Sequence, residues 1–134
     1  RTQTKDLLEK TVFVLKELGA KYTVSTQTDY ADKKQLYIDF VPLEQTAQLP
    51  KTNSTVIIVP AKKESKAQDT LQLIDCMQEH LWVGLNRAEN AGIAAVQLLN
   101  VDNKFETKLK AFRKNTEKKV IDADKKEFKK WNGR

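Results

Sequence analysis

The sequence predicts an α/β protein in which helices cover an open, mainly parallel sheet and a long helix ends the chain. Three observations lead to this fold class. Short apolar segments alternate with segments of helical periodicity, as in sheets built from strand–helix–strand units. The run TVIIVP at residues 55–60 is continuously apolar, which fits a strand buried on both faces. From Phe105 to Trp131, apolar side chains recur at steps of three or four residues, which predicts one long helix.

The N-terminal half is expected to form a helix, two strands and a loop. Residues 4–19 carry apolar side chains at helical spacing and end at Gly19, a residue typical of the position after a helix. Residues 21–28 are rich in Thr, Val and Tyr and predict a strand. Residues 35–41 alternate between apolar and polar side chains and predict a second strand. Residues 41–54 contain two prolines and many small polar residues, so we expect a loop there.

The C-terminal half is expected to continue from strand 55–60 with a helix, a strand and two further helices. Ser65 and Gln68 form a capping pattern for a helix over 65–79, with Leu71, Ile74 and Met77 or Gln78 as its apolar stripe. Residues 81–86 predict a short buried strand. Asn86 and Glu89 form a second capping pattern. The apolar stripe of the helix that follows comprises Ala91, Ala94, Ala95, Leu98 and Leu99.

Composition limits the classes of protein to which the chain can belong. Its 134 residues suit one domain, and no stretch approaches the roughly 20 apolar residues that span a bilayer. No segment resembles a signal peptide, and Cys76 is the only cysteine, so we expect a cytoplasmic protein without a disulfide. Trp82 is expected to pack in the sheet and Trp131 to anchor the last helix.

The positive charge lies in the tail of the chain. Residues 104–134 contain twelve Lys and Arg against five Asp and Glu, whereas residues 1–103 contain twelve against thirteen. We therefore divide the chain into an α/β domain at 1–103 and a basic C-terminal helix at 104–134. A basic helix can bind nucleic acid or present a solvated face while its apolar side docks elsewhere. Phe105 and Phe112 share a stripe with Leu109, so we expect them to be buried and favour docking on a neighbouring subunit.

Residues 84–130 carry a recognisable order of motifs. Asn90-Ala91 opens an Ala-rich helix, and Leu98-Leu99, Lys108-Leu109, Phe112-Arg113 and Val120 follow. This order resembles the C-terminal region of PurE, the purine-pathway family of carboxyaminoimidazole ribonucleotide mutases and phosphoribosylaminoimidazole carboxylases. Upstream, Val59-Pro60, Asp69-Thr70-Leu71 and Met77 resemble the same family at consistent spacing. The likeness covers residues 56–130, and residues 4–50 resemble the family more weakly.

The resemblance implies a fold, an assembly and a ligand. It implies a reduced three-layer sandwich of the flavodoxin-like, PurE-like kind. It also implies a homo-oligomer, an octamer in the family, with C-terminal helices reaching neighbouring subunits and sites between subunits. The ligand would be a ribonucleotide, and neither a cofactor nor a metal is implied. His80, the only histidine, has no His or Cys at ligand spacing, so we expect no metal site there.

The family's three active-site loops are replaced here. Gln3-Thr4 stand where the first loop, which holds the ribonucleotide phosphate and ribose in the family, ends in Ser-Asp. Thr28-Asp29-Tyr30-Ala31 stand where the family has Ser-Ala-His-Arg. The third, glycine-rich loop corresponds to Glu44–Lys51. If a ligand site persists, the resemblance places it at strand ends near five polar residues, namely Thr28, Tyr30, Gln45, Thr46 and Gln48.

These replacements predict a protein without turnover. Moving a carboxylate between nitrogen and carbon requires an acid–base group that titrates near neutrality, which His supplies and Tyr or Gln do not. We therefore predict a divergent PurE-like protein that acts as a ligand- or partner-binding oligomeric scaffold related to purine biosynthesis. An active mutase or carboxylase, with Thr28, Tyr30 and Gln48 replacing the lost groups, is the first alternative. A basic nucleic-acid module is the second alternative.

Overall fold

The computed structural model describes residues 2–26, 29–77 and 79–133 and contains a small parallel sheet. Its strands β1 (Leu36–Pro42), β2 (Thr55–Ala61) and β3 (Leu81–Trp82) are ordered β1-β2-β3. Ile38 pairs with Ile57, and Ile58 pairs with Trp82, both in parallel register. The open parallel sheet of an α/β protein is therefore confirmed, although β3 is shorter than the strand expected over residues 81–86.

Strand β2 is the centre of the fold because both of its faces are covered. The side chains of Val56, Ile57, Ile58 and Val59 are each at most 1% exposed. Ile57 and Val59 belong to the larger core cluster, and Val56 and Ile58 belong to a smaller one on the opposite face. The continuous apolar run thus forms the doubly buried strand that the sequence predicts.

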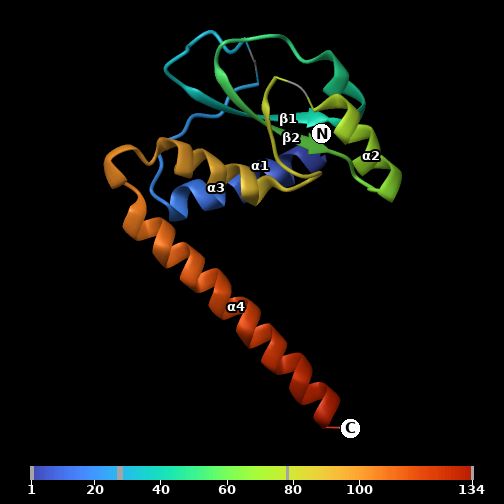
Figure 1. Cartoon of the computed structure of the whole chain (residues 1–134), viewed down its shortest axis with the longest axis vertical. Helices are drawn as coiled ribbons and strands as arrows, with labels where there is room; N and C mark the ends of the chain where they lie inside the picture. The colour runs from blue at the N-terminus through green and yellow to red at the C-terminus, as the bar shows by residue number, and fades with distance from the viewer. Residues whose placement is uncertain (1, 27–28, 78, 134) are drawn as a thin grey trace.

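Helices α1 (Thr2–Glu17) and α3 (Ala88–Leu99) pack side by side against one face of the sheet, as Figure 1 shows. Gly92 permits this close approach, since a Cβ atom there would lie 3.0 Å from Cβ of Val14. The Thr11 hydroxyl donates a 2.8 Å hydrogen bond to the Ala88 carbonyl across the same contact. At the end of α1, Gly19 has a φ of +73°, which confirms the glycine predicted to follow this helix.

The 3₁₀ helix η1 (Leu43–Gln48) follows β1 directly and contacts α2 (Ala67–Cys76). The predicted stripe of α2 is wrong, because Leu71 and Ile74 are 66% and 60% exposed. The helix instead turns Asp69 and Leu73 inward. Its start is also not capped as predicted from Ser65 and Gln68. Leu71 and Ile74 therefore lie on the exposed side of α2.

The strand predicted over residues 21–28 is also wrong. Residues 21–26 form no strand, and the side chains of Tyr22 and Val24 are exposed, while residues 27 and 28 lie outside the described part of the chain. A preference of Thr, Val and Tyr for strands reflects packing on a pleated, half-buried surface. This segment has no such surface, so its composition does not produce a strand.

Helix α4 (Glu106–Asn132) leaves the body after a tight turn at η2 (Val101–Asn103). The Asn100 side chain fixes the turn, since its Oδ1 accepts a 2.7 Å hydrogen bond from the Phe105 N–H. Leu109 is buried in the main core, and Phe105 and Phe112 pack against it, as predicted. Beyond them α4 extends away from the other elements (Figure 1), and all its residues from 113 to 132 are exposed.

Two further predictions about apolar residues are wrong. Leu98 and Leu99 are 49% and 41% exposed, because the buried face of α3 is formed by smaller residues, namely Ala88, Ala91, Gly92, Ala95 and Val96. Trp131 does not anchor the last helix within this chain, since 77% of the residue is exposed. The apolar stripe of α4 thus has a covered first part and an uncovered second part.

Candidate functional site

Of the five residues expected near a ligand, the four that the structure describes do not share one edge of the sheet. Thr28 lies outside the described residues. Tyr30 is 3% exposed, and its hydroxyl donates a hydrogen bond to the Asp39 carboxylate of β1. The Tyr30 carbonyl accepts a 2.7 Å hydrogen bond from the hydroxyl of Ser54, the residue before β2. Tyr30 is therefore fixed beside the amino end of β2 and serves the packing of the sheet.

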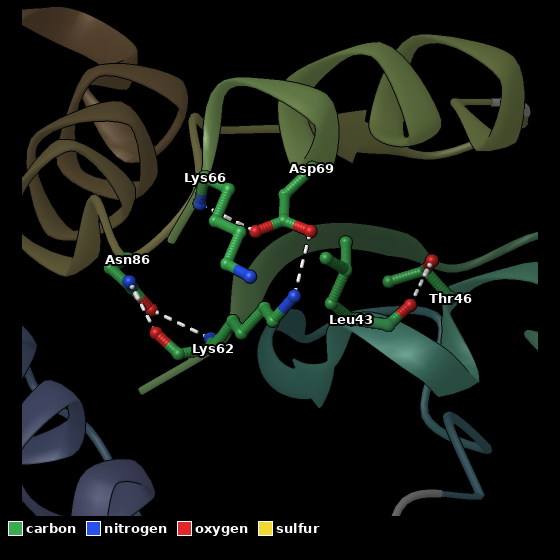
Figure 2. Close-up of polar contacts among 6 residues, drawn as sticks. All are labelled: Leu43, Thr46, Lys62, Lys66, Asp69 and Asn86. Carbon is green, nitrogen blue, oxygen red and sulfur yellow. Dashed lines mark hydrogen bonds and ion pairs between the residues drawn. The ribbon is translucent and has the colours of Figure 1, made fainter. Parts of the chain in front are cut away.

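The other three residues lie in η1, at the carboxyl end of β1. Thr46 is 3% exposed, and its hydroxyl donates a 2.7 Å hydrogen bond to the Leu43 carbonyl (Figure 2). Gln45 and Gln48 are exposed. The structure thus brings Gln45, Thr46 and Gln48 together on one turn and separates them from Tyr30. The Thr46 hydroxyl already has a structural role, so of the three predicted residues only Gln45 and Gln48 are exposed on this turn.

A polar network that the sequence did not predict occupies the carboxyl edge of β2. Asn86 accepts a 2.9 Å hydrogen bond from the Lys62 N–H and donates a 2.7 Å bond to the Lys62 carbonyl (Figure 2). Its own N–H donates to the Pro60 carbonyl at 2.8 Å. Asn86 therefore bonds to the backbone of Pro60 near the end of β2 and to the backbone of Lys62 just after it. It does this with a φ of +59°, which Asn adopts more readily than most residues.

The role of Asn86 corrects the prediction that it caps α3. The helix begins at Ala88, after Arg87, and has no hydrogen bond from a capping side chain. The spacing of Asn86 and Glu89 is the same whether the Asn86 side chain caps α3 or bonds to a neighbouring loop, so the sequence pattern cannot distinguish the two roles. Only the position of Lys62, 24 residues earlier in the chain, decides between them.

Asp69 is the second group of this network. Its carboxylate accepts a 2.7 Å hydrogen bond from the Lys62 ammonium and another 2.7 Å bond from the Lys66 N–H (Figure 2). These two hydrogen bonds, with that from Lys62 the stronger influence, lower the pKa of Asp69 from its ordinary value of 3.8. An Asp in the first turn of a helix is a frequent N-terminal cap, and this signal is visible in the sequence.

The polar side chains at this edge of the sheet hold neighbouring elements together and balance charge. Asp69 is held ionised, and its carboxylate is engaged by Lys62 and by the start of α2. His80 is half-buried beside β3. Within the described residues, no three His, Cys, Asp or Glu side chains lie close enough together to hold a metal ion. The network therefore joins β2, α2 and the start of α3.

The second candidate is a surface of α4. We call residues 113–132 the projecting half of α4. Four large apolar side chains emerge from it, and they are 45% to 77% exposed: Val120, Ile121, Phe128 and Trp131. At 100° per residue, Val120 and Trp131 lie on one line of the helix and Ile121 and Phe128 on an adjacent line. Together they form one apolar face, which no other described element covers.

Comparisons with known proteins do not assign the chain to a family. No family model matches the sequence, and no curated protein matches it. Among the described residues, no helix is both long enough and apolar enough to cross a membrane. Any assignment of function therefore depends on the residues themselves.

Proposed function

We propose that the chain is a divergent PurE-like scaffold that self-associates through the projecting half of α4 and does not turn over a carboxylated ribonucleotide. The order of motifs over residues 56–130 supports the relationship to purine biosynthesis. The reduced three-layer arrangement of that family is part of the proposal. The observation that carries the scaffold role is the uncovered apolar face formed by Val120, Ile121, Phe128 and Trp131.

This face favours association on energetic grounds. Most helical stability in proteins comes from packing an amphipathic face, and propensity alone contributes little. Burying a side chain such as Phe128 contributes about 1.5–3 kcal/mol relative to leaving it exposed. Trp131, an aromatic of the kind that dominates protein interfaces, is 77% exposed. Docking α4 would therefore stabilise both the helix and the assembly.

The scaffold role is tested by hydrodynamics. Sedimentation velocity at micromolar concentration should show wild type as an assembly larger than one chain. The variant Val120→Ser/Phe128→Ser/Trp131→Ser should sediment as a monomer with an unchanged body. Leu71→Ser/Ile74→Ser on α2 is the matched control, since these residues are equally exposed, at 66% and 60%, but lie on another element. A wild type that remains monomeric at high concentration contradicts the scaffold role.

The absence of turnover is tested separately. Tyr30 is hydrogen-bonded to Asp39, and no histidine stands among the predicted site residues, so a group for proton transfer near neutral pH is missing there. We expect no conversion of carboxyaminoimidazole ribonucleotide above background. Calorimetric titration with aminoimidazole ribonucleotide asks whether the exposed glutamines of η1 still bind the ribonucleotide. Measurable turnover would support the alternative of an active mutase or carboxylase.

Nucleic-acid binding is the second candidate, and one observation favours it. Phe128 and Trp131 are exposed on the basic helix, where aromatic side chains can stack on bases between lysines. Acidic residues Glu117, Asp124 and Glu127 lie along the same apolar face, which weakens attraction to phosphates. A mobility-shift titration with single-stranded RNA separates the two candidates. Retardation that disappears with rising salt and with Trp131→Ser would favour the nucleic-acid module.

A further inference from the structure

Strand β1 is an open edge of the sheet. The strand order is β1-β2-β3, and no described segment other than β2 pairs with β1. A strand in this position presents a row of unpaired N–H and C=O groups on its outer side. All residues from Leu36 to Phe40 are half-buried, which fits a strand that has a neighbouring strand on one side only.

The described residues that precede β1 leave its outer side accessible. Residues 21–26 and 31–35 are exposed, so they do not pack along the strand. Tyr30 is buried, but its carbonyl accepts a hydrogen bond from Ser54, the residue before β2. This contact holds Tyr30 at the amino end of β2, on the inner side of β1.

Strand β1 also lacks most of the features that protect edge strands from pairing. Proteins guard such edges with very short strands, bulges, proline or outward-pointing lysine. β1 has seven residues, its register with β2 continues without a bulge, and its only proline, Pro42, comes last. Its single charged residue, Asp39, accepts a hydrogen bond from the Tyr30 hydroxyl. The opposite edge strand, β3, has only two residues and is protected by its shortness.

Helix α1 extends the apolar surface beyond this edge. Helix α3 contacts both β1 and β2, whereas α1, beside it, contacts chiefly β1. Packed helices lie about 8–10 Å apart and paired strands about 4.8 Å apart, so the axis of α1 lies outside β1. Val14 packs against Gly92 of α3, and Leu8 and Val12 lie more than about 100° around α1 from it. These two half-buried side chains line a shallow hollow of about 300 Å³ on the flank of α1 away from α3.

A fourth strand beside β1 would use both features. Its backbone would pair with the outer N–H and C=O groups of β1. Because successive side chains of a strand point to opposite faces, every second one would point to α1 and cover Leu8 and Val12. The edge therefore fits a segment whose side chains towards α1 are apolar and whose other side chains are polar.

The geometry favours a single extended segment over a second copy of this chain. Two copies that pair antiparallel through β1, about a two-fold axis, would have both α1 helices on the same face of the joined sheet. Their β1 strands would lie about 4.8 Å apart, whereas two packed helices require about 8–10 Å. Each α1 lies outside its own β1 and would therefore occupy space that the helices of the other copy already fill.

We propose that the outer side of β1, together with Leu8 and Val12 of α1, binds an extended segment of another protein by adding it to the sheet as a fourth strand. The segment contains no proline and has β-branched apolar side chains at alternate positions. This β1 edge site goes beyond the proposed self-association and does not depend on it, because α4 takes no part in the contact.

Titration with a peptide tests the pairing. The probe is a fluorescein-labelled octapeptide of alternating threonine and valine, added to the full chain and followed by fluorescence anisotropy. Two control peptides carry methyl groups on the backbone nitrogens of the threonines or of the valines. The two sets of N–H groups point to opposite sides of a strand, so only one control peptide should bind about tenfold more weakly or worse. Equal affinity of all three peptides, or no binding at millimolar peptide, overturns the inference.

A variant of α1 tests the apolar part of the site. Val12→Glu places a charge over the added strand and should weaken binding of the unmethylated peptide by about fivefold or more. Leu98→Glu, a similar change at a residue of α3 that is 49% exposed, is the matched control and should bind as wild type does. Circular dichroism checks that both variants are folded, and the methylated peptides decide the question if Val12→Glu is not. Unchanged binding by a folded Val12→Glu contradicts the contact with α1.

Amide exchange measured by NMR identifies the occupant of the edge. In the free chain, alternate amides of β1 should exchange rapidly, and excess unmethylated peptide should slow them by about tenfold or more. Protection of every β1 amide without peptide would show that the edge is already covered. Protection that rises with protein concentration in Val120→Ser/Phe128→Ser/Trp131→Ser would identify a second copy as the occupant. Either result overturns this inference, whereas a failure of α4 to self-associate overturns only the proposed scaffold.

Discussion

Asn86 is the residue that joins the end of β2 to the start of α3. Its side chain makes two hydrogen bonds to the backbone of Lys62, at 2.9 and 2.7 Å, and its φ is +59°. We expect Asn86→Ala to lower the free energy of unfolding by about 1–3 kcal/mol, from the lost hydrogen bonds and the strained backbone. Asn86→Gly, which removes the same hydrogen bonds without the backbone strain, should cost less. Urea denaturation measures both, and equal losses would contradict a contribution from the left-handed backbone.

Asp69 should make stability depend on pH at the acidic end. Hydrogen bonds from Lys62 and Lys66 lower the pKa of Asp69 in the folded protein, so its contribution is complete above the unfolded value of about 3.9. That contribution is lost as pH falls through the lowered folded pKa. The stability difference between wild type and Asp69→Asn should therefore be largest near neutral pH and shrink below about pH 4. A difference that is constant from pH 7 to pH 2.5 in thermal unfolding would rule out this role.

At the scale of elements, the packing of α1 against α3 depends on Gly92, where the two helices are in close contact. Alanine is a better helix former than glycine, but a Cβ atom here would lie 3.0 Å from two atoms of Val14, which is 1% exposed. We expect Gly92→Ala to destabilise the protein by about 1–3 kcal/mol through overpacking. Gln97→Ala, on the exposed side of the same helix, should change stability by less than about 0.5 kcal/mol. A stabilised Gly92→Ala variant in thermal unfolding would show that α1 can shift away.

The sequence predicts elements well where neighbours in the chain decide them. The run at 55–60 is apolar at every inner position, which fits a strand covered on both faces, and β2 is that strand. Of the apolar stripe predicted over residues 4–19, Leu8 is half-buried, and the other members are buried, namely Leu7, Thr11, Val14, Leu15 and Leu18. Leu71, Ile74 and Trp131 were predicted to pack because they are apolar and correctly spaced. Spacing identifies an apolar face, but it cannot show whether another element covers that face.

The candidate site was harder to predict than the fold, because its groups meet across the chain. Asn86 and Lys62 are 24 residues apart, and no local pattern indicates that they bond. The resemblance predicts Tyr30 and Thr46 as ligand-binding residues, but both direct their hydroxyl groups to partners inside the protein. A side chain's chemistry can be read from sequence, whereas the partner that engages it depends on tertiary contacts.

At the scale of the whole molecule, the chain consists of a packed α/β body and a helix that extends beyond it (Figure 1). The first part of α4 is fixed by Asn100 and Leu109. The projecting half has polar contacts within itself, such as the 2.8 Å ion pair between Lys130 and Glu127. Such exposed pairs contribute about 0.5 kcal/mol each, which is too little to hold about five turns of helix. The proposed scaffold role therefore requires a second copy to cover the apolar face.

Hydrogen exchange of the α4 amides tests this requirement most directly. Wild type is compared at a dilute and a concentrated condition, and Val120→Ser/Phe128→Ser/Trp131→Ser serves as the unassociated reference. We predict that amides from Arg113 to Asn132 exchange rapidly when dilute and become protected as concentration rises, while amides of β2 remain protected throughout. Equally rapid exchange of the projecting half at both concentrations would contradict the claim that a second copy covers it.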